Sequence, residues 1–306
     1  MSDSLIEQAA QRLEQLRQAG VVLPESVANK SAEASSPIQE KPVHEQHGAG
    51  AGSVTKRIEL DLDALTAQGF QTPNARRNVV ADQYRVIKRP LIRNAVGKGA
   101  HTINHANLIM VTSALAGEGK SFTSLNLALS IAAELDHTVM LVDADVARPS
   151  ILRMLNLPSG PGLLDVLEQS ADVSDVLLRT NVDKLTILPS GQPHRQATEL
   201  LASEAMRGLL DDMAQRYPDR IIIFDSPPLL LTTESRVLAS RMGQIVVVVQ
   251  ARKTPQHAVM QALDTIESCP VKLMLLNQVR EDAIGGYGYG YGQTYGYGHE
   301  HENAGA

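Results

Sequence analysis

The stretch Ser113-Ala-Leu-Ala-Gly-Glu-Gly-Lys-Ser121 decides how this sequence folds. It follows an apolar run at 108–111 and precedes a helical pattern predicted over 121–134. Gly117 and Gly119 allow the backbone to curl until successive N–H groups point inward, and the helix start adds the positive end of its dipole. Because both features attract anions, the stretch predicts a phosphate-binding loop between a strand and a helix.

Two side chains of this loop carry the expected chemistry. Lys120 is placed to reach the β- and γ-phosphates of a nucleotide, and the Ser121 hydroxyl is placed to bind Mg²⁺. The usual pattern has Gly at position 114, where this chain has Ala, the next smallest residue. We therefore predict that ATP and Mg²⁺ bind here. The predicted nucleotide-binding residues of the loop are Ala116, Gly117, Glu118, Gly119, Lys120, Ser121 and Phe122.

Apolar runs alternate with helical patterns through the middle of the chain. The strand-like runs lie at 108–111, 139–142, 185–188, 221–224, 245–249 and 273–276, and the helical patterns lie at 121–134, 196–216, 229–241 and 256–268. Runs that are apolar on both faces and separated by helices indicate a mostly parallel sheet with helices on both sides. The predicted fold is α/β, of the P-loop NTPase type, with ligands at the carboxyl ends of the strands.

Acidic residues follow two more of these strands. Asp143 and Asp145 lie two residues apart after the second strand, so both are expected to project toward one site, where a metal ion and a proton transfer would explain them. The alternative is a turn in which an aspartate caps a helix. Asp225 follows four bulky apolar residues, the place where P-loop proteins hold Mg²⁺. Pro227 and Pro228 then prevent the strand from continuing.

Composition divides the chain into three parts: a leader at 1–75, a folded core at 76–282 and a tail at 283–306. The leader is expected to contain an amphipathic helix from Ser4 to Gly20 and then a flexible linker. Apolar and acidic residues alternate over 58–62 like a short strand, but five residues are too few to assign one.

The tail holds five of the seven tyrosines, mostly alternating with glycine. One hypothesis is a cluster of phosphate acceptors; the alternative is a low-complexity tail that only assembles. Each phosphotyrosine adds about −1.5 to −2 charges, which would release the tail from a carboxylate-lined site. The predicted acceptors are Tyr287, Tyr289, Tyr291, Tyr295 and Tyr297, and outside the tail only Tyr84 and Tyr217 remain as candidates.

These motifs together resemble the bacterial tyrosine autokinases of exopolysaccharide synthesis, over roughly residues 78–298. The matching blocks are Gly117–Ser121, Asp143–Asp145, Glu199–Ser203 and Phe224–Pro228. The resemblance implies a tyrosine kinase domain at 76–282 that transfers the ATP γ-phosphoryl group to its own tail, between subunits.

The resemblance also implies roles for single residues. Lys120, Asp143 and Asp145 would be catalytic, and Ser121, Asp145 and Asp225 would contact Mg²⁺, while the choice of base between Asp143 and Asp145 stays open. Asn277 resembles a residue that recognises adenine in related folds. The chain has Ala147 where the family usually has a basic residue before Arg148-Pro149, a form typical of the subgroup beside exosortase-linked gene clusters.

A basic segment precedes the core. Residues 76–98 contain seven basic residues and one acidic residue, and Asp82, Arg85 and Lys88 within it resemble the family's subunit-contact motif. Residues three apart share a helix face, so this motif predicts a homo-oligomer whose contacts could close a ring; the alternative is a solvated helix face. Pro90 is expected to kink or end the helix.

Composition excludes several classes. The chain has 306 residues and a formal charge of −6, with no apolar run near the ~20 residues of a membrane span and no secretory signal, which predicts a cytoplasmic protein without nucleic acid as partner. One cysteine, Cys269, excludes an intrachain disulfide. The resemblance implies a separate membrane-embedded chain-length regulator as activator, which would bring the protein to the inner membrane.

Two alternatives remain. A ParA/MinD-type positioning ATPase shares the fold, but such proteins carry a lysine early in the loop, where this chain has Leu115. The other is a nucleotide-bound scaffold without transfer activity.

Overall fold

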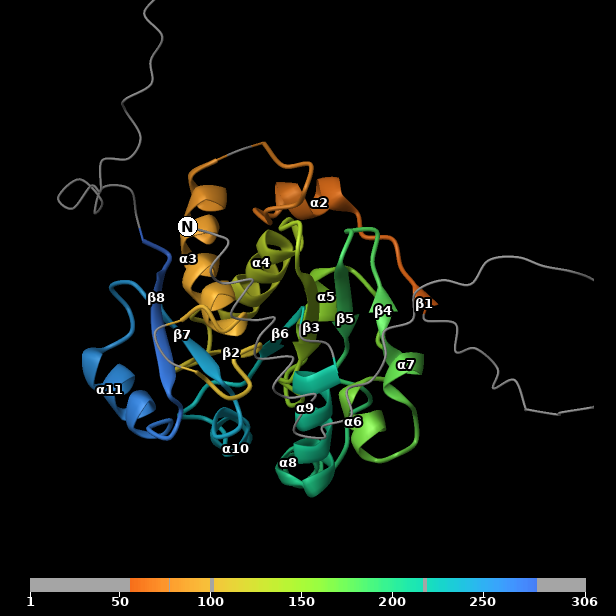
Figure 1. Ribbon diagram of the computed structural model, residues 1–306. Helices are drawn as coiled ribbons and strands as arrows, with labels where there is room; N and C mark the ends of the chain where they lie inside the picture. The colour runs from red at the N-terminus through yellow and green to blue at the C-terminus, as the bar shows by residue number, and fades with distance from the viewer. Residues whose placement is uncertain (1–55, 77, 100–101, 217–218, 280–306) are drawn as a thin grey trace, which may run out of the picture. The chain divides into compact units, whose positions relative to one another are not determined.

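The computed structural model describes residues 56–76, 78–99, 102–216 and 219–279. Its centre is an eight-stranded sheet in the order β1-β4-β5-β3-β6-β2-β7-β8, parallel throughout except for the β4–β5 pair (Figure 1). The strands are β1 (Lys56–Arg57), β2 (Leu108–Ser113), β3 (Thr138–Asp143), β4 (Leu178–Arg179), β5 (Leu185–Leu188), β6 (Arg220–Asp225), β7 (Gln244–Gln250) and β8 (Val271–Asn277). The predicted α/β fold with a mostly parallel sheet is therefore confirmed, as are the six predicted strands.

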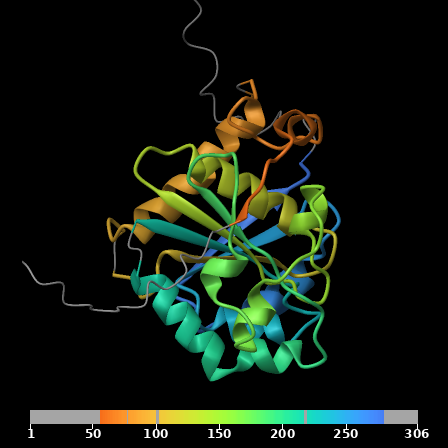
Figure 2. The same ribbon diagram turned by 90° about the vertical axis from the view of Figure 1, so that its right-hand side faces the viewer.

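Helices cover both faces of this sheet (Figures 1 and 2). They are α2 (Leu62–Ala67), α3 (Val79–Ala95), α4 (Lys120–Ala132), α5 (Ile151–Met154), α6 (Leu163–Leu167), α7 (Val173–Val176), α8 (Ala197–Ala202), α9 (Glu204–Arg216), α10 (Glu234–Ala239) and α11 (Gln256–Asp264). None of the helices in these described segments is both long and apolar enough to cross a bilayer.

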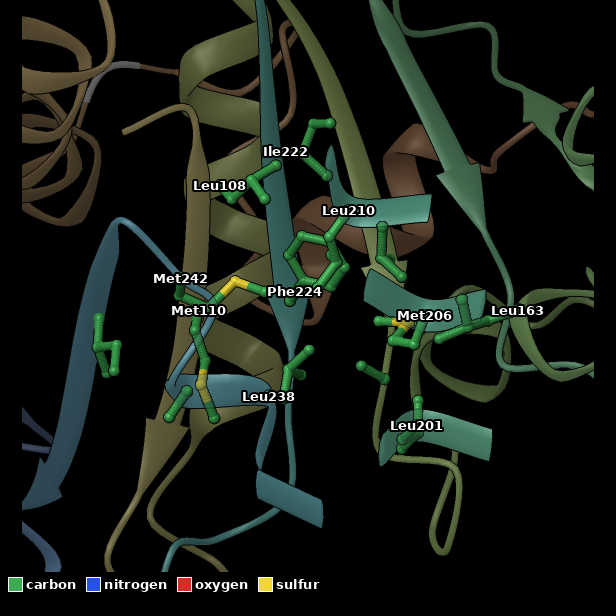
Figure 3. Packing of buried hydrophobic residues seen from close by; sticks show 14 of the residues in the cluster. Leu108, Met110, Leu163, Leu201, Met206, Leu210, Ile222, Phe224, Leu238 and Met242 are labelled. Carbon is green, nitrogen blue, oxygen red and sulfur yellow. The ribbon is translucent and has the colours of Figure 1, made fainter. Parts of the chain in front are cut away.

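Alternate residues of each central strand supply two separate cores. In β6, Ile222 and Phe224 pack with α8, α9 and α10, as Figure 3 shows. Their neighbours Ile221 and Ile223 face the other way and pack with α3 and α4. Because strand side chains alternate between faces, a strand covered by helices on both sides must be apolar at every position. This explains why the runs were visible in the sequence.

Two of the predicted helices differ from the observed helices in their bounds. The helix expected over 196–216 is two helices, α8 and α9, because Ser203 between them has an extended backbone (φ −71°, ψ 164°). The helix expected over 229–241 begins only at Glu234. The reason is that Leu229 N–H donates to the carbonyl of Ser113 (2.8 Å), which ties the chain after β6 to the end of β2.

The alternating stretch at 58–62 does not form a strand. The strand β1 ends at Arg57, and Leu62 already begins α2. The side chain of Asp61 accepts a hydrogen bond from the Ala64 N–H (2.9 Å), which is the pattern of a helix N-cap rather than a strand.

Residues that the composition placed in the leader belong to the core. Leu60, Leu65 and Phe70 are buried in the same cluster as Leu91 of α3 and Leu125 of α4. Packing therefore continues across the boundary predicted at 75–76. The helix expected from Ser4 to Gly20 and the tail at 283–306 lie outside the described residues.

The sequence predicted that Pro90 kinks or ends α3, and the structure excludes the second of these outcomes. The helix continues to Ala95 with Pro90 inside it. A proline lacks the N–H that would bond to the carbonyl four residues earlier, here that of Val86. Because Val86 is 68% exposed, this turn of the helix faces solvent, where water can satisfy that carbonyl.

Candidate active site

A cavity of about 700 Å³ lies where the sequence placed the site, at the carboxyl ends of the central strands. Three segments that are distant in the sequence form it: the loop before α4, the segment after β3 and the segment after β6. Its lining residues are Ala116, Gly117, Gly119, Lys120, Ser121, Phe122, Asp145, Ala147, Arg148, Ser150, Arg153, Met154, Pro227, Pro228, Leu231 and Thr232.

The glycines of the loop have the backbone that a phosphate-binding curl requires. Gly117 and Gly119 have φ values of +85° and +92°, a region that side chains disfavour. A Cβ atom on Gly119 would also lie 2.2 Å from Asn277 Nδ2. The helix α4 begins at the next residue, Lys120, so its first N–H groups point toward the cavity.

Lys120 is held between two carboxylates. Its Nζ lies 2.6 Å from Asp145 Oδ2 and 3.8 Å from Asp225 Oδ1. The Lys120 and Asp145 side chains are largely buried, which strengthens their attraction relative to a surface pair. The structure thus brings together the lysine and one acid from each of the two acidic motifs.

Asp225 lies at the bottom of this group and is fully buried. Its carboxylate accepts hydrogen bonds from Ser124 Oγ (3.1 Å) and Ser150 Oγ (3.5 Å). Burial raises the pKa of Asp225, while the Lys120 charge opposes that rise. Ser124 and Ser150 were not predicted. Ser124 is one helical turn after Lys120, a spacing that could have suggested it.

Asp143 does not share the cavity with Asp145, contrary to the sequence prediction. Its Oδ2 accepts the backbone N–H groups of Ser150 and Ile151, both at 3.0 Å, at the start of α5. Its Oδ1 is buried without a partner among the described residues. Burial raises the pKa of Asp143 to about 7, and the Asp225 charge adds to this rise. The alternative in which an aspartate caps a turn thus describes Asp143.

Glu118 also points away from the cavity. Its side chain is 2% exposed, and its Oε2 accepts the Leu115 N–H at 2.6 Å. Only its backbone can contact a nucleotide. Asn277, expected to recognise adenine, donates from Nδ2 to the Glu118 carbonyl (2.9 Å); its contact with adenine stays a prediction.

Phe122 lines the cavity, and its contact with a nucleotide stays a prediction; its ring packs against Phe70, which the sequence analysis did not single out. The ring centroids of Phe70 and Phe122 are 4.9 Å apart in a tilted arrangement. Arg148 and Arg153 also line the cavity. Arg148 was noted in the second motif without a role, and its position here suits contact with an anion.

The oxygen atoms at this site fit a magnesium ion. Ser121 and Asp145 line the cavity, and Asp225 lies beside them with its charge only partly balanced by Lys120. Hydroxyl and carboxylate oxygens are the ligands that Mg²⁺ prefers, together with water and phosphate oxygens.

The predicted subunit-contact motif divides into two parts. Arg85 and Asp82 form an ion pair with each other on the surface of α3. Lys88 is instead buried and bound within its own chain, to Glu134 Oε1 (2.6 Å) and the Ser130 carbonyl (2.5 Å) of the α4 region. The expectation that all three residues share one exposed face is therefore wrong for Lys88.

The predicted acceptor tyrosines, 287 to 297, lie outside the described residues, as does Tyr217. Tyr84 is the one candidate acceptor within the described segments. It is buried in the core, and burial raises its pKa to about 12. Its hydroxyl is therefore poorly placed to accept a phosphoryl group.

Comparison with known proteins gives matches over this same region. Residues 106–278 match the model of the AAA domain family. The chain is 30% identical over 207 residues to tyrosine-protein kinase YwqD of Bacillus subtilis, covering 65% of this chain and 84% of YwqD. It is 33% identical over 178 residues to tyrosine-protein kinase CpsD of Streptococcus agalactiae, covering 57% of this chain and 76% of CpsD. It covers only 24% of tyrosine-protein kinase ptk of Acinetobacter johnsonii, at 33% identity.

Solved structures show the same fold. The kinase domain of the Escherichia coli tyrosine kinase ETK aligns with a TM-score of 0.60 at 22% identity, covering 80% of this chain and 94% of that domain. The VpsO kinase domain aligns with a TM-score of 0.53 at 27% identity, covering 66% of this chain and all of that domain. The fold of this chain is thus one found in solved kinase domains.

Proposed function

Because this chain belongs to the AAA domain family, and within it to the bacterial tyrosine-protein kinases, we propose that it transfers the γ-phosphoryl group of ATP to tyrosines of its own C-terminal segment. The observation that carries the proposal is the meeting of Lys120, Asp145 and Asp225, from three distant segments, beside one cavity. The proposed acceptors are Tyr287, Tyr289, Tyr291, Tyr295 and Tyr297.

In this proposal the loop binds the phosphates and Lys120 contacts the β- and γ-phosphates. Backbone N–H groups of the loop and of the first turn of α4 donate to phosphate oxygens. Ser121, Asp145 and Asp225 would hold Mg²⁺, which supplies neutralisation of the phosphate charge when bound. Catalysis then depends on positioning and charge, because phosphoryl transfer requires little covalent chemistry from the protein.

Of Asp143 at the end of β3 and Asp145 just beyond it, we propose that Asp145 contacts the reactants directly. Asp145 lines the cavity and pairs with Lys120, whereas Asp143 binds the start of α5. Asp143 would then act by fixing the segment that carries Arg148 and Ser150.

We also propose that the transfer occurs between subunits of a homo-oligomer and that a membrane-embedded chain-length regulator activates the kinase at the inner membrane. The exposed Asp82–Arg85 pair of α3 supports a subunit contact there. The regulator and a role in exopolysaccharide synthesis rest on the resemblance to the autokinase family.

The test is incubation of the purified full chain with ATP and Mg²⁺, with activator supplied, followed by detection of phosphotyrosine. Lys120→Met is expected to abolish labelling, and replacement of the five tail tyrosines by Phe is expected to remove most labelling while leaving ATP binding intact. A wild-type chain that stays unlabelled contradicts the proposal and favours the nucleotide-bound scaffold.

Transfer between subunits is tested by mixing two variants. The five-Phe chain supplies an intact site, and the Lys120→Met chain supplies intact tyrosines. Label on the Lys120→Met chain supports transfer between subunits, whereas label that appears only in unmixed wild-type chain contradicts it.

A further inference from the structure

The phosphate-binding loop has little stiffness of its own at its tightest point. Glu118 lies between Gly117 and Gly119, whose φ values are +85° and +92°. Glycine allows this curl but also allows many other conformations. The N–H groups of such a loop attract anions only while they converge on one point. Bonds to residues outside the loop are therefore needed to stabilise its curled backbone.

The Glu118 side chain supplies bonds of that kind on the side away from the cavity. Its Oε2 accepts the Leu115 N–H (2.6 Å), which closes the loop on itself. Its Oε1 accepts the Gln250 N–H (3.3 Å) at the end of β7 and the Thr254 hydroxyl in the turn that follows. Three donors offset the cost of burying the carboxylate, which would be large if it were unpaired.

The main chain of Glu118 is held as well, by the neighbouring strand. Its carbonyl accepts from Asn277 Nδ2 (2.9 Å) at the end of β8. Gln250 Nε2 in turn donates to Gln278 Oε1 (2.5 Å), which joins the ends of β7 and β8 to each other. The loop is thus fastened to two strands while its inner N–H groups face the cavity.

We propose that Glu118 is a positioning residue for nucleotide binding. Through Leu115 and Thr254 it keeps the loop curled for phosphate, and its carboxylate does not touch the nucleotide. This inference rests on the proposed function, because it names what keeps the ATP site in its binding geometry.

The experiment measures the affinity of the full chain for a fluorescent ADP analogue with Mg²⁺, beside thermal unfolding of each variant. Glu118→Ala is expected to weaken binding at least about tenfold, since it removes bonds to a charged group and leaves the Leu115 N–H unpaired. Glu118→Gln keeps the shape and part of the bonding, so its loss is expected to be smaller. Thr254→Val removes one donor and is expected to weaken binding, whereas Thr254→Ser is expected to restore it.

A matched control separates positioning from general destabilisation. Gln244 is fully buried at the opposite end of β7, where its Nε2 donates to the carbonyls of Leu91 (3.0 Å) and Ala106 (2.6 Å). Gln244→Ala is expected to lower the unfolding temperature and to leave nucleotide affinity unchanged. If Glu118 acts through Thr254, the double variant Glu118→Ala, Thr254→Val binds no more weakly than Glu118→Ala alone.

Each result bears on the inference. Wild-type affinity in a folded Glu118→Ala or Glu118→Gln chain overturns it, as does an equal loss of affinity in Gln244→Ala, and additive losses in the double variant overturn the route through Thr254. These failures leave the proposed function standing. A wild-type chain that does not bind the nucleotide overturns both.

Discussion

Lys120 Nζ and Asp145 Oδ2 lie 2.6 Å apart in the wall of the cavity. A phosphate that binds this lysine competes with the aspartate for the same ammonium group, and the aspartate then needs another cation. In the proposed mechanism that cation is Mg²⁺, so the pair couples binding of the nucleotide to binding of the metal.

Asp145→Asn is expected to reduce this coupling. Lys120 loses its nearest anion, so ATP should bind in the presence of a chelator at least as tightly as to wild type, while phosphotyrosine formation should fall by about 100-fold or more. Nucleotide titrations with and without Mg²⁺ measure the first effect and phosphotyrosine detection the second. Asp136→Asn, at an exposed carboxylate, is the matched control. Wild-type labelling in Asp145→Asn would contradict the assigned role.

Asp143→Ala is expected to act mainly on stability. It leaves the N–H groups of Ser150 and Ile151 without their acceptor, at a cost of about 1–3 kcal/mol of unfolding free energy. Denaturant unfolding measures this loss. Asp143→Asn keeps one acceptor oxygen and should lose less. Equal stability of Asp143→Ala and wild type would show that Asp143 does not hold α5.

Because Tyr84 is buried, we expect the folded chain to lose stability in alkaline solution. The pKa of Tyr84 is about 12 in the folded chain and near 10.0 when unfolded, so between these values the unfolded chain binds fewer protons. By linkage, its contribution makes stability fall as pH rises above about 10, by up to about 1.4 kcal/mol per pH unit. Tyr84→Phe should flatten the fall measured by denaturant unfolding at pH 9 to 11. An unchanged slope in the variant would contradict the assigned burial effect.

Replacing Arg85 and replacing Lys88 by alanine are expected to affect different properties, oligomer mass for Arg85 and stability for Lys88, although both residues belong to the same predicted motif. Lys88→Ala leaves the buried Ser130 carbonyl without its donor and should lower the unfolding free energy by about 1–3 kcal/mol. Arg85→Ala removes only a surface pair and should change stability by less than about 1 kcal/mol, but should reduce oligomer mass in light scattering. If Arg85→Ala keeps the wild-type mass, the contact lies elsewhere.

The six longer strands were predictable because each contains a run that is wholly or almost wholly apolar, and the phosphate-binding loop because its glycines and lysine have a fixed order. The two-residue strands β1 and β4 were missed, since two residues show no periodicity. The break at Ser203 was also missed, because the apolar pattern runs through it.

The direction of side chains at the site was harder to predict. Asp143 lies at the end of β3 and Asp145 lies in the turn beyond it. The two side chains differ in direction because the N–H groups of Ser150 and Ile151 bind the carboxylate of Asp143. The orientation of Glu118 depends on Thr254, which is 136 residues away. A local sequence pattern cannot indicate a hydrogen-bond partner so far away in the chain.

The close approach of Gly119 to Asn277 constrains how this protein can change over evolutionary time. The Asn277 amide occupies the space that a Cβ at position 119 would need. A larger residue at 119 would therefore need a shorter or redirected side chain at 277, and it would still be strained by the positive φ of +92°. We therefore expect descendants of this chain to retain glycine at 119.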